Sequence, residues 1–165
     1  MFRWILGGVL AAIICLIVVL TRGSTKTSYV NGLAPYSEIP GREYIFQRDC
    51  YIFGFKATSS DWPFVGSRLT VPELPSDVDA KNVGASFANV RILDTVTTGT
   101  RFRIASVRRD QKGPKATITY EILIGEEGAR KYYRVDAFWM LDDPAERPGT
   151  APKIMADYAV PRRNE

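Results

Sequence analysis

The sequence predicts an all-β or β-rich domain, folded as a small barrel or sandwich, behind one N-terminal transmembrane helix. Residues 4–20 contain neither a charged residue nor a proline, which is typical of a membrane-spanning segment. After residue 20 no long stretch repeats apolar residues every 3.6 positions, whereas aromatic and β-branched residues are plentiful. Residues 115–124 alternate apolar and polar side chains, the pattern of a half-buried strand.

Residues 1–23 are predicted to be a transmembrane anchor or an uncleaved signal. A helix over residues 4–20 would be about 26 Å long, enough for a thin bilayer. A cleaved secretory signal is the alternative, but its best small-x-small site places Arg22 between two small residues. A buried core helix is a third interpretation and fits least, because such helices rarely lack a polar face. Lipidation of Cys15 is not expected, because two bulky residues precede it.

Behind the anchor the chain divides into three predicted parts. They are a connector over residues 24–42, one β-barrel-like domain over residues 43–160 and a charged tail over residues 161–165. Basic residues flank the anchor about equally, so their distribution does not decide its orientation in the membrane. We use instead the tendency of a short N-terminal tail to stay in the cytoplasm. The expected location is the inner (plasma) membrane, crossed once, with the soluble domain outside the cytoplasm, in a periplasm-like space.

The first half of the domain contains two predicted strands and a long loop. Residues 43–47 alternate, and residues 50–56 place three aromatic side chains on one face and Ile52 on the other. Residues 29–30, within the connector, are a further short candidate. Prolines interrupt residues 57–82, which predicts a long irregular loop of the kind that often carries function.

The second half is more regular. Four strands are predicted, over residues 85–93, 101–109, 115–124 and 129–137. Phe102 and Ile104 share a face, and a β-bulge near residues 105–106 would bring Val107 onto the same face. The apolar run 138–141 is expected to close the core, and residues 154–160 to add one more short element.

Residues 96–104 combine a Gly-Thr turn with a strand of alternating apolar and basic residues. Together with the following hairpin and residues 133–135, this motif resembles bacterial SH3-like barrels over about residues 43–141. The resemblance implies a binding or scaffolding role rather than catalysis. The long segment 57–82 departs from a minimal SH3-like module, and an OB-like barrel fits the pattern nearly as well.

The composition excludes several kinds of active site. The chain contains no histidine, which excludes Ser-His-Asp and Cys-His catalysis and histidine-ligated zinc. With Cys15 in the anchor, Cys50 has no partner for a disulfide or a cysteine metal site, and its apolar neighbours favour burial. No Gly-x-x-x-x-Gly-Lys motif is present.

Carboxylate chemistry is the catalytic possibility that remains. The neighbouring acids are Glu126-Glu127 and Asp142-Asp143, and a pair of carboxylates is what glycoside cleavage requires. Both pairs lie among turn residues, where acids are ordinarily solvated. We therefore predict that the chain is not an enzyme and uses no cofactor and no metal.

Basic side chains form the first candidate binding surface. Arg101 and Arg103 would lie on the outward face of one strand, with Arg108 and Arg109 at its far end beside two lysines. Such a surface suits an acidic partner or the phosphates of anionic lipids or glycans. The alternative is a solvated face on which acidic residues, Glu121 and Asp110, neutralise the arginines.

Aromatic side chains form the second candidate surface. Trp62 and Phe64 lie in the long loop, and Tyr132 is expected to point outward while Tyr133 points into the core. They would form a partner-binding patch, or the two loop residues would fold back on the domain as a lid.

These features predict a membrane-anchored extracytoplasmic binding or scaffolding protein of an envelope assembly, with a protein as its partner. Two alternatives stay open, an immunity- or inhibitor-type protein that blocks an enzyme in the periplasm and a cell-wall or glycan-binding module. Clustered acids opposite an exposed aromatic residue would favour the inhibitor, and an open aromatic groove would favour glycan binding. Without Arg3 and Arg22, 20 of the 22 basic residues face 18 acidic ones, so no nucleic-acid partner is expected.

Overall fold

The computed structural model describes residues 25–55, 63–67, 69–71, 74, 80–87, 89–125 and 132–162. These residues form ten paired strands and two short 3-10 helices, so the predicted β-rich class is confirmed. The strands are β1 (Lys26–Tyr29), β2 (Glu43–Phe46), β3 (Cys50–Phe55), β4 (Phe64–Gly66), β5 (Ser86–Phe87), β6 (Val90–Val96), β7 (Arg101–Lys112), β8 (Lys115–Ile124), β9 (Tyr133–Asp136) and β10 (Ala159–Pro161). The helices are η1 (Ala80–Asn82) and η2 (Phe138–Met140).

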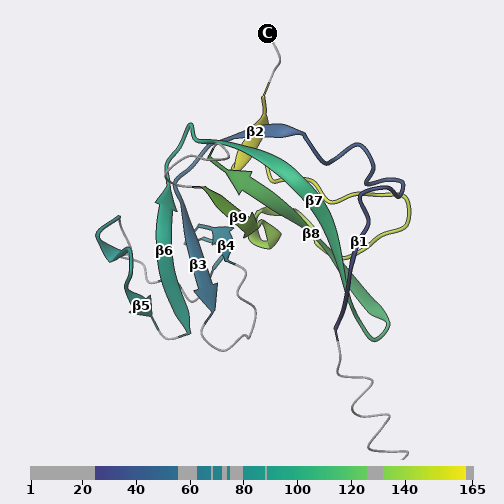
Figure 1. Ribbon diagram of the computed structural model, residues 1–165, viewed down its shortest axis with the longest axis horizontal. Helices are drawn as coiled ribbons and strands as arrows, with labels where there is room; N and C mark the ends of the chain where they lie inside the picture. The colour runs from purple at the N-terminus through teal and green to yellow at the C-terminus, as the bar shows by residue number, and fades with distance from the viewer. Residues whose placement is uncertain are drawn as a thin grey trace, which may run out of the picture.

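The strands form one open sheet, in the order β10-β2-β7-β8-β9-β4-β3-β6-β5. The hairpin of β7 and β8 contains the two longest strands of this sheet. Figure 1 shows both strands twisting strongly along their length. β7 is long enough to pair with two strands on the same side. β2 pairs with its first residues, and β1 pairs with residues 108–111.

The predicted β-bulge in β7 is confirmed. Phe102 and Ile104 pair with Ile124 and Ile122 of β8, after which the register shifts between Ile104 and Ser106. Val107 is fully buried on the same apolar face. A single extra residue in one strand reverses which side chains face the core, so the bulge preserves the apolar face of the hairpin.

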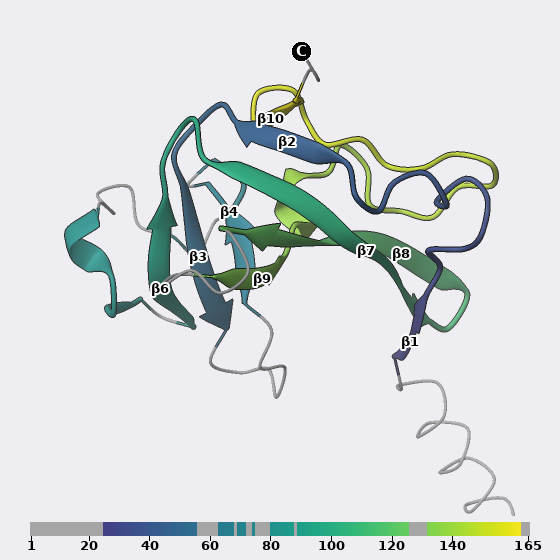
Figure 2. The same cartoon turned by 45° about the horizontal axis from the view of Figure 1, so that its top comes forward.

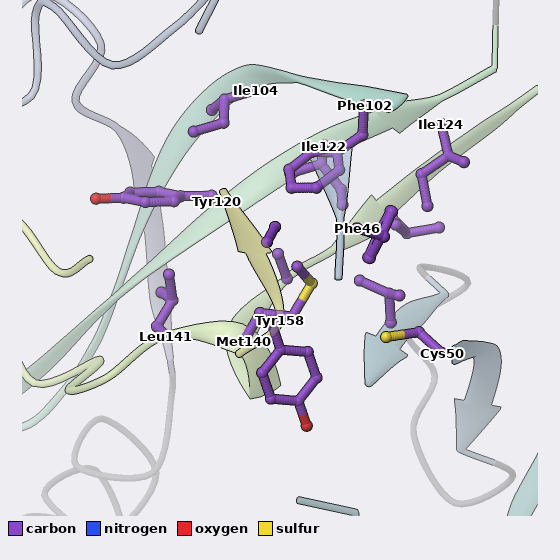
Figure 3. Close-up of a cluster of buried hydrophobic side chains, with 14 of the residues drawn as sticks. Phe46, Cys50, Phe102, Ile104, Tyr120, Ile122, Ile124, Met140, Leu141 and Tyr158 are labelled. Atoms are coloured by element: carbon purple, nitrogen blue, oxygen red, sulfur yellow. The ribbon is translucent and has the colours of Figure 1, made fainter. Parts of the chain in front are cut away.

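The main core lies between the inner face of this hairpin and the C-terminal segment (Figure 3). Met140 and Leu141 pack into it, as expected for the apolar run 138–141, and the Tyr158 side chain is fully buried beside them. Tyr133 packs at the edge of this core and Tyr132 is exposed, as predicted.

β3 is buried on both faces. Cys50 and Ile52 face the main core, whereas Phe53 belongs to a second cluster that includes Val71, Leu74, Val90 and Ile92. The predicted division of this strand into an aromatic face and an Ile52 face is therefore confirmed. Cys50 is buried, as expected, and this burial raises the pKa of its thiol to about 12.

Three segments differ from the sequence prediction. Residues 57–82 are not entirely irregular, because β4 lies there, paired antiparallel with β3 and parallel with β9. The strand predicted over residues 85–93 is divided into the short hairpin of β5 and β6. β7 continues through Lys112, so its turn is limited to Gly113 and Pro114. Non-local pairing extends or divides these strands, and local patterns carry no information about it.

The predicted connector contributes to the sheet and to the core. β1 lies within it, and Val30, Tyr36 and Ile39 are buried in the main core. The predicted anchor, residues 1–23, lies outside the described residues. Among the residues that the structure describes, no helix is both long enough and apolar enough to span a bilayer.

Candidate functional site: an arginine-lined cleft

The outer face of the sheet, opposite the main core, contains a cleft of about 480 Å³. It lies where β7 begins and β8 ends, next to the last described residue of the chain. Its lining residues are Glu43, Thr100, Arg101, Phe102, Arg103, Leu123, Gly125, Tyr132 and Arg162. The volume is within the range of sites for small molecules or for a few side chains of a protein partner.

Strand alternation positions the two central arginines. Phe102 and Ile104 point into the core, so Arg101 and Arg103, between them on β7, point outward and are exposed. Leu123 lies directly opposite Arg103 on β8. Gly125 follows β8 with a φ of 90°, a left-handed conformation that glycine adopts without strain.

The cleft has a net positive charge. Arg162 donates a hydrogen bond from its guanidinium to Glu43 Oε2 at 2.6 Å, which neutralises one arginine. Arg101 and Arg103 form no ion pair with any described residue. With the exception of Arg91, every other arginine in the described segments pairs with a carboxylate, so the two unpaired arginines of the cleft are unusual in this chain.

A second hollow, of about 200 Å³, adjoins the cleft and shares Thr100 and Gly125 with it. Its polar side chains include Asp94, whose carboxylate accepts a hydrogen bond from the Tyr133 hydroxyl at 2.8 Å. This hydrogen bond raises the pKa of Tyr133. The surface that a partner could contact therefore continues from the arginines toward the turn that precedes β7.

Arg108 lies away from the cleft, in a buried network of charges. Its side chain is 15% exposed and donates to Asp136 Oδ2 at 2.6 Å and to Asp110 Oδ2 at 3.0 Å. Its guanidinium also lies 3.7 Å from Glu121 Oε1. The alternative raised from the sequence, in which Glu121 and Asp110 neutralise the basic face, therefore describes Arg108.

Glu121 is the centre of this network, and its side chain is completely buried. Ser106 Oγ and Arg134 each donate to Glu121 Oε2 at 2.5 Å, and the Tyr29 hydroxyl donates to Oε1 at 2.9 Å. Three donors on three strands thus converge on one carboxylate, and Tyr29 adds a side-chain contact between β1 and β8 to the backbone pairing of β1 with β7.

The network shifts the pKa values of its two buried carboxylates in opposite directions. Burial opposes ionisation of Glu121, but hydrogen bonds from Ser106, Arg134 and Tyr29 outweigh it and lower the pKa. Burial raises the pKa of Asp136, although Arg108 acts against this rise. Because both carboxylates are buried and hydrogen-bonded, we assign the network to holding the strands together.

The remaining sequence candidates occupy other places. Arg109 binds Glu146 through its Nε at 2.8 Å, so it is not part of the cleft either. Phe64 packs against the second cluster, with its ring 5.9 Å from Phe53 and 5.5 Å from Phe55, the fold-back arrangement considered for the loop. Trp62 lies outside the described residues.

The acid pair Asp142 and Asp143 stabilises a loop. Asp142 Oδ1 accepts from the backbone N–H groups of Asp143 and Lys153, each at 2.8 Å, and Asp143 binds Arg147. Glu126 and Glu127 lie outside the described residues. Among the described residues, no three histidine, cysteine, aspartate or glutamate side chains gather in a way that would hold a metal ion.

The structure thus joins three of the sequence candidates, Arg101, Arg103 and Tyr132, in one cleft. No local pattern in the sequence indicates that Arg162 or Glu43 belongs to it. Arg162 falls in the predicted tail, and its pairing with β2 through Glu43 depends on a contact between distant parts of the chain. No family model, no curated protein and no solved structure matches this chain.

Proposed function

We propose that this chain is a membrane-anchored extracytoplasmic binding protein that docks a protein of an envelope assembly through the arginine-lined cleft. Residues 1–23 anchor it in the inner membrane, and the sheet domain lies outside the cytoplasm. It performs no catalysis. The absence of histidine from the chain and the use of the acid pair 142–143 in loop hydrogen bonds support this part of the proposal.

One observation carries the proposal: Arg101 and Arg103, side by side on a paired strand, have no carboxylate partner among the described residues. A guanidinium presents a planar fork of donors that matches a carboxylate. Arg162 already binds a carboxylate at the edge of the cleft, that of Glu43. We propose that acidic side chains of the partner bind Arg101 and Arg103 in the same manner.

The surroundings of the two arginines favour a protein over a free anion. Leu123 supplies an apolar side chain, and Tyr132 is 37% exposed, so both suit a neighbouring apolar side chain of the partner. Glu43 lowers the positive charge of the cleft and disfavours multiply charged phosphates. We also propose an SH3-like or OB-like barrel for the domain, a fold that is typical of binding modules. A Gly-Thr turn followed by a strand of alternating apolar and basic residues, over residues 96–104, supports this fold.

The alternatives receive less support. An inhibitor was expected to present clustered acids, but Asp142 and Asp143 are engaged within their own loop. Glycan binding would require an open aromatic groove. Among the described lining residues of the cleft, Tyr132 is the one aromatic side chain that is exposed, so the cleft does not have this form. An acidic protein partner therefore remains the first proposal.

Co-purification tests the proposal. The full chain, extracted in detergent, is used as bait in its natural form, as the double variant Arg101→Gln/Arg103→Gln and as Arg91→Gln. Arg91 is a matched control, an exposed arginine on β6 that likewise lacks a carboxylate partner among the described residues. We expect one stoichiometric envelope protein with the natural chain and with Arg91→Gln, and its loss with the double variant. Equal retention by all three, or recovery of a toxin-like enzyme, would contradict the proposal.

The topology is tested separately. A reporter that is active only outside the cytoplasm, fused after Glu165, is expected to be active. A reporter that is active only inside should give no signal. The reverse result would place the domain in the cytoplasm and would overturn the proposed location, whatever the cleft binds.

A further inference from the structure

The start of β1 and the turn of the β7–β8 hairpin form one end of the molecule. Lys26 lies opposite Gln111, and Lys112 lies opposite Lys115 beside the turn. All three lysines are exposed. Figure 2 shows β1 beginning next to this turn, at the end of the hairpin farthest from β2. We call Lys26, Lys112 and Lys115 the lysine tip.

None of the three lysines of the lysine tip forms an ion pair with a described residue. Asp110 is engaged by Thr27 and Arg108, and Glu146 is engaged by Arg109. Lys112 and Lys115 are directly paired across the hairpin, an arrangement in which like charges repel. An external anion that binds both lysines would relieve this repulsion.

The chain itself brings a source of anions close to the lysine tip. The apolar segment ends at Leu20, and five residues separate it from Lys26. Six steps of extended chain span at most about 20–22 Å. If the segment crosses the bilayer, the lysine tip therefore lies within a few Debye lengths of the lipid headgroups.

We propose that the lysine tip rests on the anionic headgroups of phospholipids and so fixes the tilt of the domain on the membrane. This inference rests on the proposed anchor, but it does not depend on what the cleft binds. Arg101 and Lys112 are the two ends of β7, which at 3.3 Å per residue would be at most about 36 Å apart. A domain that stands on the lysine tip therefore holds the cleft well away from the bilayer.

The experiment uses the full chain in phosphatidylcholine vesicles with and without phosphatidylglycerol. A fluorescent label is attached at Pro114→Cys, in the turn, in a Cys15→Ser background, because Cys50 is fully buried. Quenching by lipids with a spin-labelled headgroup reports the approach of the turn to the surface. Each lysine near an anionic surface is expected to change the docked population about fivefold.

We expect stronger quenching in the vesicles with phosphatidylglycerol, and about a 25-fold smaller docked population for Lys112→Gln/Lys115→Gln. Lys153→Gln, an exposed lysine of the C-terminal loop, is the matched control and should behave as the natural chain. Equal quenching in both vesicles, or no effect of the double variant, would overturn the lysine tip alone. A chain that an alkaline wash removes from the vesicles would overturn the anchor and this proposal together.

Discussion

Tyr29 adds a side-chain contact to the backbone pairing that holds β1 on β7. Half of its surface is exposed, yet its hydroxyl donates to the completely buried Glu121. This hydrogen bond raises the pKa of Tyr29 and helps to lower that of Glu121. A strand of four residues is too short to be stable on its own, so its position depends on such side-chain contacts.

We predict that Tyr29→Phe lowers the free energy of unfolding by about 1 kcal/mol at neutral pH. A carboxylate whose pKa is lowered by folding stabilises the protein above its unfolded pKa, near 4.5 here, and this stabilisation is lost as the pH falls through the folded pKa. Tyr29→Phe removes part of this stabilisation. The difference in the free energy of unfolding between the natural chain and Tyr29→Phe should therefore shrink below pH 4.5.

Urea unfolding of the full chain in detergent, measured over a pH series, checks this prediction. Asp136, whose raised pKa acts in the opposite direction, forms its hydrogen bonds with Arg108, Thr119 and the backbone of Phe138 and none with Tyr29, so its contribution is common to both proteins. Tyr132→Phe is the control, because no described residue bonds to that hydroxyl. A difference that stays constant with pH, or that Tyr132→Phe reproduces, would count against the role given to Tyr29.

For single residues, the sequence predicts on which face of a strand a side chain lies better than it predicts whether that side chain is buried. The alternation predicted over residues 115–124 puts the polar Thr119 and Glu121 on the face opposite the core, but both are buried there. Arg108 and Arg134 cover Glu121 from neighbouring strands, and such coverage depends on which strands pair. For the same reason the sequence grouped Arg108 with Arg101, although one is buried in ion pairs and the other is exposed.

At the scale of elements, β4 shows how a short strand depends on close packing. A Cβ atom on Gly66 would lie 2.8 Å from Val71 Cγ2 and 3.2 Å from Trp139 Cβ, closer than side chains tolerate. Gly54, on the neighbouring β3, has no atom within 4 Å of the corresponding position. β4 thus requires a glycine where β3 does not.

We predict that Gly66→Ala destabilises the full chain by about 1–3 kcal/mol, because the added methyl group overpacks the space between β4, Val71 and Trp139. Gly54→Ala should change the free energy of unfolding by no more than about 0.5 kcal/mol. Denaturant unfolding of both variants in detergent gives the comparison. Equal effects would mean that β4 is not packed as described.

The elements also show which signals the sequence contains. β8 has the residue range predicted from its alternation, and the bulge in β7 follows from the opposite parity of Val107. β4 escaped prediction because it has three residues and lies between β3 and β9, and β9 is distant in the chain. The single strand predicted over residues 85–93 failed because its apolar pattern continues across the turn between β5 and β6.

At the scale of the whole molecule, the two unpartnered basic surfaces lie at opposite ends of β7. The cleft is at Arg101 and the lysine tip is at Lys112. The sequence suggested a connector that reaches at most about 56–61 Å when extended over residues 24–40. Because β1 is already paired at Lys26, much less free chain remains between the predicted anchor and the sheet. Under the proposed topology, β7 rather than a loose connector sets the distance of the cleft from the bilayer.

Arg101 and Arg103 are proposed to bind a carboxylate. The most direct test of this binding is an NMR titration of the full chain in detergent, labelled with ¹⁵N in arginine, with the acetyl-glutamate amide as probe and the glutamine analogue as control. We predict saturable shifts of the Nε–H signals of Arg101 and Arg103 at roughly 1–10 mM glutamate probe, with Arg91 unmoved. No shift, the same shift with the glutamine analogue, or an equal shift of Arg91 would contradict carboxylate binding by Arg101 and Arg103.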